Sequence, residues 1–293
     1  MGRHPLVSAG AVLLLLCICL PLAGCGALVR SATSPVMENL ASSIKRQQDL
    51  ETVRQGIPSY MLFMDALVQG SPCDEDTLTS ASSLLTAYAV AFTLDNDPER
   101  ARIMTAKAKD YAVRALAQRS NVFARLWDKP AAEFGPVPAD LGPDDVKYLH
   151  AAITAWGAYI KARPGSWTDV ADVPKLQALA RRLLELDPTY SHGAPHVLMG
   201  VLYTLLPPAY GGKPELAREH FEEAIRISQG ADLLAMVTYA ENYARPLQDR
   251  ELHDRLLHRV LETPVDTVPE LTLQNALARR AASALLDQAD DYF

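Results

Sequence analysis

The sequence has few cysteines and offers no pair for an internal disulfide. Four occur in 293 residues, at Cys17, Cys19, Cys25 and Cys73. The first two lie in an N-terminal apolar run and the third follows it closely, so a chain cut before Cys25 keeps Cys73 as its one other thiol. That number excludes a disulfide framework, even in an oxidising compartment. We expect Cys73 to be a small buried hydrophobic residue rather than a reactive thiol.

Long hydrophobic runs are also missing. The apolar run from about Ala9 to Leu20 is far below the ~20 residues that a membrane-spanning helix needs. A short basic start at Arg3 and small residues after the run are typical of a signal peptide. The following Leu22-Ala23-Gly24-Cys25 resembles the bacterial lipobox, whose cysteine is lipidated. The alternative is an ordinary signal peptide followed by a chance cysteine.

We therefore predict a lipoprotein signal peptide over residues 1–24, acyl chains on Cys25, and a lipidated tether over 25–36. The chain would be anchored to a membrane and face the periplasm. Gly26, rather than aspartate, follows the cysteine, which favours the outer membrane.

Excess positive charge is absent. The formal net charge is −7, and removal of the predicted signal peptide takes away Arg3 and leaves −8. Nucleic-acid binding proteins usually carry a basic stripe, so nucleic acid is excluded as a partner. A polybasic membrane surface is excluded for the same reason, and membrane attachment must come from the lipid.

Strand-like and glycine-rich segments are scarce, and alanine, leucine and charged residues recur at helical spacing. The one clear irregular stretch is 128–143, which holds four prolines. Elsewhere the pattern predicts an all-α fold, with helices over 37–53, 58–68, 75–94, 98–119, 121–127, 143–161, 174–186, 195–205, 213–228, 232–245, 248–262 and 269–288.

One helical pair fits the 34-residue tetratricopeptide (TPR) pattern. Met199-Gly200-x-x-Tyr203 precedes Ala217-x-x-x-Phe221-x-x-Ala224. The second set is spaced by four and three, so it forms one stripe on a helix. We expect Gly200 to let the two helices approach closely, while Phe221 fills the space between them.

Three other pairs repeat this pattern weakly, for example Leu84-Leu85-x-x-Tyr88 with Ala101-x-x-x-Thr105-x-x-Ala108. Some turns, such as 206–212, are longer than the strict repeat allows. A generic helical bundle remains the alternative for the first pair. We predict TPR-like helical hairpin repeats, four degenerate pairs and a closing helix, forming one superhelical or bundled domain over 37–293.

Catalytic fingerprints are missing as well. The sequence has no G-x-S-x-G, H-E-x-x-H, P-loop or dinucleotide motif. His192 and His196 are four apart, but Pro195 is expected to begin the helix, which leaves His192 outside it and the pair without a third ligand. Glu222 and Glu223 are expected on a solvated helix face. We predict no enzyme activity, no cofactor and no metal site.

The C-terminal half resembles the TatT-type T-component lipoproteins of TRAP transporters. The resemblance rests on the order of several motifs along the chain. These are Gly211-Gly212-x-Pro214-Glu215-x-Ala217-x-x-x-Phe221-x-x-Ala224, Tyr239-Ala240-x-x-Tyr243-Ala244, Gln248-Asp249-Arg250, Leu271-x-x-x-Asn275-x-Leu277-Ala278 and Leu285-Leu286.

This resemblance implies a lipid-anchored periplasmic homotrimer that binds the solute-binding protein of a TRAP transporter and encloses a cavity in each protomer. Repeat arrays bind on their concave face. A ligand or partner groove would then be lined by Tyr203, Tyr210, Tyr239, Glu241, Asn242, Tyr243 and Arg245. For the tyrosines, however, core packing with the hydroxyls at the rim is the favoured role, and the groove is the functional alternative. A general TPR scaffold for envelope protein assembly is the alternative function, whereas a cell-wall hydrolase would need a catalytic domain for which no segment is left.

Overall fold

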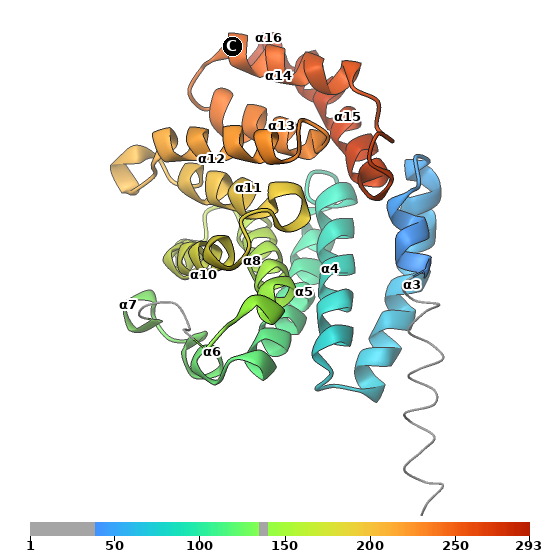
Figure 1. Ribbon diagram of the computed structural model, residues 1–293, viewed down its shortest axis with the longest axis vertical. Coiled ribbons are helices and arrows are strands. Elements are labelled where there is room, and N and C mark those ends of the chain that lie inside the picture. Colours follow the sequence, from blue (N-terminus) through green and yellow to red (C-terminus); the bar gives the residue numbers. More distant parts are fainter. Residues whose placement is uncertain (1–38, 135–139) are drawn as a thin grey trace, which may run out of the picture.

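The computed structural model describes residues 39–134 and 140–293, and every regular element in these ranges is a helix (Figure 1). The predicted all-α class is confirmed, whereas the TPR-like superhelix stays a prediction. The predicted signal peptide and Cys25 lie outside the described residues. None of the helices in the described ranges combines the length and apolar character needed to cross a membrane.

The helices follow one another closely, joined by short turns. Residues 39–45 are helical and precede α3. The longer α-helices are α3 (Leu50–Gly70), α4 (Glu75–Phe92), α5 (Pro98–Arg119), α8 (Val146–Lys161), α10 (Val173–Leu186), α11 (Tyr190–Thr204), α12 (Pro214–Ile227), α14 (Arg250–Glu262) and α15 (Thr272–Asp287). The shorter elements are α6 (Asn121–Leu126), α7 (Ala131–Phe134), η1 (Pro143–Asp145), α9 (Trp167–Val170), η2 (Pro208–Tyr210), α13 (Leu233–Tyr239), η3 (Ala240–Ala244), η4 (Pro269–Leu271) and α16 (Ala289–Tyr292).

Neighbours in sequence are mostly neighbours in space. α4 packs against α3 and α5, α8 against α5 and α10, and α11 between α10 and α12. The last long helix, α15, packs on α13 and α14 and then comes back to contact α3, on the right-hand side of Figure 1. The first and the last of the long helices, α3 and α15, are therefore in contact.

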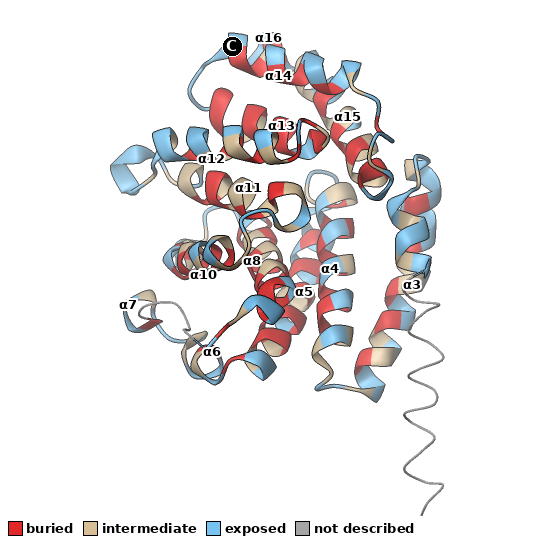
Figure 2. Ribbon diagram, viewed as in Figure 1, coloured by how far each residue is buried: buried red, intermediate tan, exposed pale blue. Residues whose placement is uncertain are grey.

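Two clusters of buried side chains stabilise the described residues (Figure 2). The first is built from α3 to α11, and its buried members run from Val53 to Leu202. The second is built from α12 to α15, and its buried members run from Ala217 to Ala282. Tyr203, near the end of α11, packs against both clusters, so α11 is shared by an N-terminal and a C-terminal half.

Helix starts follow the predicted capping chemistry. The side chain of Asp97 accepts a hydrogen bond from the Arg100 N–H at 3.1 Å, and Pro98 occupies the first turn of α5, as predicted. Pro143, Pro214 and Pro269 likewise stand in the first turn of their elements, where a missing N–H is harmless.

The predicted break at Gly56 and Pro58 is wrong. α3 runs through both residues without interruption, and the break lies at residues 46–49 instead, where Asp49 caps α3. Pro58 cannot donate to the carbonyl of Arg54 one turn earlier. The Tyr88 hydroxyl of α4 donates to that carbonyl at 3.0 Å, and so replaces the missing helical hydrogen bond.

The prediction of a buried Cys73 is also wrong, because this thiol is exposed. Cys73 lies in the turn between α3 and α4, residues 71–74, which faces solvent where two antiparallel helices join.

Two irregularities of the backbone were not predicted. Ser191, His192 and Gly193 all have left-handed φ angles, of 45°, 61° and 92°, so the right-handed part of α11 begins just before Pro195. The predicted helix over 232–245 widens after α13 into a π-helical turn over Ala240–Ala244. The left-handed turn depends on tertiary packing, because a left-handed non-glycine residue is intrinsically unfavourable.

Candidate functional site

The hairpin of α11 and α12 has the close contact that its sequence predicts. A Cβ on Gly200 would lie 2.7 Å from two ring atoms of Phe221, which is inside van der Waals contact. Ala217, Phe221 and Ala224 are all fully buried and form the stripe that faces α11. Gly200 therefore sets the distance between the two helices.

Two tyrosines predicted for the groove lie in the core behind this hairpin. Tyr239 is 2% exposed and its ring stacks on Phe221, with the centroids 5.0 Å apart. Tyr243 is 6% exposed and lies 5.2 Å from the Tyr239 ring. The Tyr239 hydroxyl reaches Glu222 at 3.4 Å, and burial raises the pKa of this phenol above its usual value. Both rings fill space that the second cluster needs.

Three further residues of the predicted groove, Glu241, Asn242 and Arg245, are half-buried and contact other residues of the protein. The Asn242 amide donates to the Thr238 carbonyl of its own helix at 3.0 Å. Glu241 lies 3.5 Å from the ammonium of Lys161 on α8.

Arg245 packs over the ring of Tyr292 at 4.0 Å. The half-buried Tyr203 lies beside His220, with the ring centroids 5.7 Å apart. The residues predicted to line one groove thus lie in several different surroundings and do not line a single surface.

Tyr210 is the predicted residue most open to solvent. It is 68% exposed, and its ring lies 6.5 Å from the ring of Trp167, which is 74% exposed. Large aromatic side chains are seldom this exposed, and grouped exposed apolar side chains usually mark interaction sites. Trp167 was not predicted, although Gly165 and Ser166 directly before it indicate a break between helices.

Glycine fixes the loop that presents Tyr210. A Cβ on Gly212 would lie 1.8 Å from the carbonyl oxygen of Leu206, and Gly211 has a φ of +97°. These positions require glycine, since a side chain would collide with backbone or adopt a left-handed conformation. Tyr210 lies in the connection between α11 and α12, and Trp167 lies in the connection between α8 and α10. We call this pair of neighbouring aromatic residues the aromatic patch.

The histidines of α11 do not pair with each other. His192 lies in the left-handed turn, with its Nε2 3.7 Å from Glu270. His196 instead meets His220 of α12, with 3.0 Å between the two Nδ1 atoms. Burial lowers the pKa of both His196 and His220. Within the described residues no group of three or more potential ligands is arranged for a metal ion.

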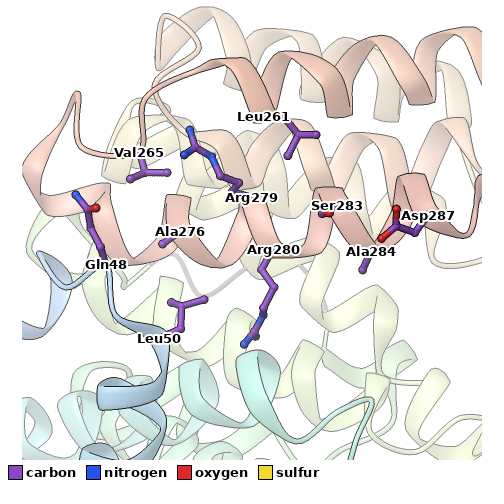
Figure 3. Close-up of a pocket in the computed structure, with 10 residues that line it drawn as sticks. All are labelled: Gln48, Leu50, Leu261, Val265, Ala276, Arg279, Arg280, Ser283, Ala284 and Asp287. Atoms are coloured by element: carbon purple, nitrogen blue, oxygen red, sulfur yellow. The ribbon is translucent and has the colours of Figure 1, made fainter.

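A groove lies between the start of α3 and the exposed face of α15 (Figure 3). Its volume is about 720 Å³, and it is largely open to solvent rather than an enclosed cavity. Gln48 and Leu50 contribute from the N-terminal half, and Arg279, Arg280, Ser283 and Asp287 contribute from α15. No motif in the sequence indicated this groove, because it forms where the two ends of the helical path meet.

The described residues thus form an all-helical protein of packed hairpins, with an aromatic patch and a groove on its surface. The family model described as TRAP transporter T-component matches residues 46–293, and the chain belongs to this family. The predicted resemblance is therefore confirmed. The family is an accessory component of TRAP transport and not an enzyme family.

A curated relative supports the extent of the match. A protein of Treponema pallidum (strain Nichols), described as an uncharacterized protein, is 25% identical over 262 residues. The alignment covers 84% of this chain and 81% of the relative. The similarity therefore extends over most of both chains.

Proposed function

We propose that this chain is a lipid-anchored, periplasm-facing accessory component of a TRAP-type solute transport system, which binds the solute-binding protein and holds a small ligand in a cavity. The observation that carries the proposal is the family match over residues 46–293. The lipid anchor at Cys25, the outer-membrane location and a homotrimeric state are parts of the same proposal.

The aromatic patch is the surface best suited to the partner. Tryptophan and tyrosine dominate the binding energy of many protein interfaces. Trp167 and Tyr210 are exposed by 74% and 68%, whereas Tyr239 and Tyr243 of the predicted groove are buried. Substitution of the buried pair would test folding rather than binding, so the partner test belongs on the exposed pair.

The test is direct binding to the solute-binding protein encoded beside this gene. Two periplasmic proteins that separate in each transport cycle should associate weakly, on the order of micromolar. We expect Trp167→Ala combined with Tyr210→Ala to weaken the association about 30-fold or more, as loss of a hot spot does. Isothermal titration calorimetry of the purified pair measures both values.

The matched control is Phe63→Ala, which removes another exposed aromatic side chain, from α3. This variant should bind as the parent does. If the purified pair shows no association at high micromolar concentration, or if no solute-binding protein is encoded nearby, the transport proposal fails. The general scaffold for envelope protein assembly then takes its place. Light scattering of the purified protein should give the mass of about three protomers.

A further inference from the structure

The solvent-facing side of α3 beyond Arg54, together with the turn that follows it, carries no charge. Every exposed residue from Gln55 to Cys73 is uncharged, although charged residues make up 22% of the chain. These exposed residues are Gln55, Gly56, Ser59, Leu62, Phe63, Ala66, Gln69, Gly70, Pro72 and Cys73. The charged residue within the range, Asp65, has a side chain that is only 21% exposed, and it pairs with Lys107 of α5. We call the exposed set the neutral face of α3.

Two large apolar side chains stand at the centre of the neutral face. Leu62 is 72% exposed and Phe63 is 46% exposed. Ser59 precedes them by three and four residues, and Ala66 follows them by four and three, so the four side chains lie next to one another on the helix. α3 packs mainly on α4 and lies at the edge of the molecule (Figure 2). Grouped exposed apolar side chains usually mark a surface that another molecule covers.

Other helices of the same chain have charged outer faces. The exposed residues of α12 are charged, with the exception of Leu216. Those of α14 are charged, with the exceptions of His258 and Leu261. Such charged faces are typical of helices that face water. The neutral face therefore differs from the water-facing surfaces of these two helices, and its composition suits contact with a less polar surface.

The position of α3 in the chain favours a lipid surface as that contact. α3 is the first long helix after the predicted tether, which joins Cys25 to Asn39, the first described residue. A chain of about 14 residues spans at most about 50 Å, so acyl chains on Cys25 would keep the folded body beside the membrane. The chain carries a net charge of −7, and charged side chains lose hydration when they enter a lipid layer. The neutral face avoids this cost.

We propose that the neutral face of α3 lies on the phospholipid surface to which acyl chains on Cys25 attach the protein, with Leu62 and Phe63 at the boundary between headgroups and acyl chains. The inference rests on the proposed function, because it requires the lipid anchor in that proposal. The acyl chains supply the stable attachment, whereas two apolar side chains add only weak binding of their own. The neutral face therefore sets the orientation of the anchored protein, and with it the surfaces that point into the periplasm.

Quenching by brominated lipid tests this contact. The acylated protein is reconstituted into phosphatidylcholine vesicles, with or without bromine near the headgroup end of the acyl chains. Phe63→Trp places a fluorophore on the neutral face, and the matched control Ile103→Trp places one on α5, where Ile103 is 65% exposed. The fluorescence of the parent, which has three tryptophans, is subtracted from both. We expect brominated lipid to quench the tryptophan of Phe63→Trp by about half or more, because interfacial side chains lie about 5–10 Å deep. The tryptophan of Ile103→Trp should not be quenched.

A second variant places a charge on the neutral face. Leu62→Asp, made in the Phe63→Trp protein, should remove most of the quenching, because an aspartate keeps its hydration only outside the lipid layer. Ile103→Asp in the same protein adds the same charge at another strongly exposed position and should leave the quenching unchanged. Both substitutions lie at solvent-exposed positions, so equal melting temperatures of the two variants are expected.

Flotation of the protein with the vesicles reports the acyl anchor separately. A protein that floats but shows no quenching in Phe63→Trp, or equal quenching in Ile103→Trp, would overturn the membrane contact and leave the anchor and the transport proposal standing. Acrylamide then shows what the face meets, since a second protein chain would shield the introduced tryptophan and water would not. A protein that does not float would overturn both the anchor and the membrane contact, whereas binding of the solute-binding protein is measured independently in solution.

Discussion

At Gly200 the absence of a side chain determines how closely α11 and α12 approach each other. A Cβ there would lie 2.7 Å from the Phe221 ring, which is itself fully buried and stacked on Tyr239. We expect Gly200→Leu to destabilise the protein by about 1–3 kcal/mol through overpacking. Thermal unfolding followed by circular dichroism measures the change.

Gly157 in the middle of α8 is the matched control. Apart from its chain neighbours and the backbone of its own helix, no described atom lies within 4 Å of the place where its Cβ would stand. Gly157→Ala should raise stability by about 0.5–1 kcal/mol, because alanine has less backbone freedom to lose. A melting temperature that Gly200→Leu leaves unaltered would show that the two helices are not in this register.

His150 on α8 makes stability depend on pH. Burial beside the Tyr190 ring lowers the pKa of this imidazole to about 4, against about 6.5 in an unfolded chain. Between these values the unfolded chain binds a proton that the folded protein does not. Stability should therefore fall as pH drops from 6.5 to about 4, by up to about 1.4 kcal/mol per pH unit from this group.

Urea unfolding at pH 7.5, 5.5 and 4.5 measures that dependence. His150→Phe keeps a ring against Tyr190 and removes the titrating group, so its loss of stability over this range should be smaller. His196 and His220 act in the same direction, because burial lowers their pKa values too. Equal slopes for the parent and His150→Phe would contradict the assignment.

Single residues were predictable from sequence where a local pattern defines their surroundings. The stripe of Ala217, Phe221 and Ala224, and the close approach at Gly200, follow from helical spacing and were predicted. The exposed Cys73 was predicted wrongly, because hydrophobicity alone does not show that a residue stands in a turn. Trp167 was missed because its exposure depends on how two distant connections meet.

At the scale of elements, α3 shows how a neighbouring helix can supply the hydrogen bond that a proline removes. The Tyr88 hydroxyl donates to the Arg54 carbonyl that Pro58 leaves without its helical partner. We expect Tyr88→Phe to destabilise the protein by about 0.5–1.5 kcal/mol, the net worth of one hydrogen bond. The Phe ring should keep the contact with Phe92.

A double-mutant cycle isolates this contact. Pro58→Ala supplies an N–H to the Arg54 carbonyl, so Tyr88→Phe should cost less in that background than in the parent. Urea unfolding of the four proteins gives the coupling free energy. Identical costs in both backgrounds would mean that the hydroxyl does not replace the helical hydrogen bond.

Most element types were predictable, whereas their interruptions were not. The periodic spacing and proline starts placed α5, α8, α12 and α15 close to their observed bounds. The predicted break at Gly56 and Pro58 was wrong because the Tyr88 hydroxyl, which replaces the missing N–H of the proline, lies on another helix. The left-handed turn at 191–193 and the π-helical turn at Ala240–Ala244 carry no comparable local signal.

For the molecule as a whole, membrane attachment is predicted to come from acyl chains on Cys25. We expect Cys25→Ala to abolish acylation and to leave the precursor uncleaved by the lipoprotein signal peptidase. Several acyl chains, at ~0.8 kcal/mol per buried CH₂, are enough for stable anchoring. Metabolic labelling with palmitate and fractionation of membranes measure the two effects.

Globomycin, which blocks that peptidase, should make the parent protein accumulate as precursor. Normal processing in its presence would contradict the lipoprotein assignment, and the alternative of an ordinary signal peptide would follow. The helical body is expected to stay folded in Cys25→Ala, since the described clusters begin well after this position.

The division of the core at α11 has a consequence for the order in which the chain acquires its shape. Among the described residues, every buried member of the first cluster lies at or before Leu202, and those of the second begin at Ala217. In a chain that emerges N-terminus first, these residues of the first cluster are all present before Ala217 emerges. The N-terminal half, including α11, can thus fold first. The later helices then pack against the surface of α11.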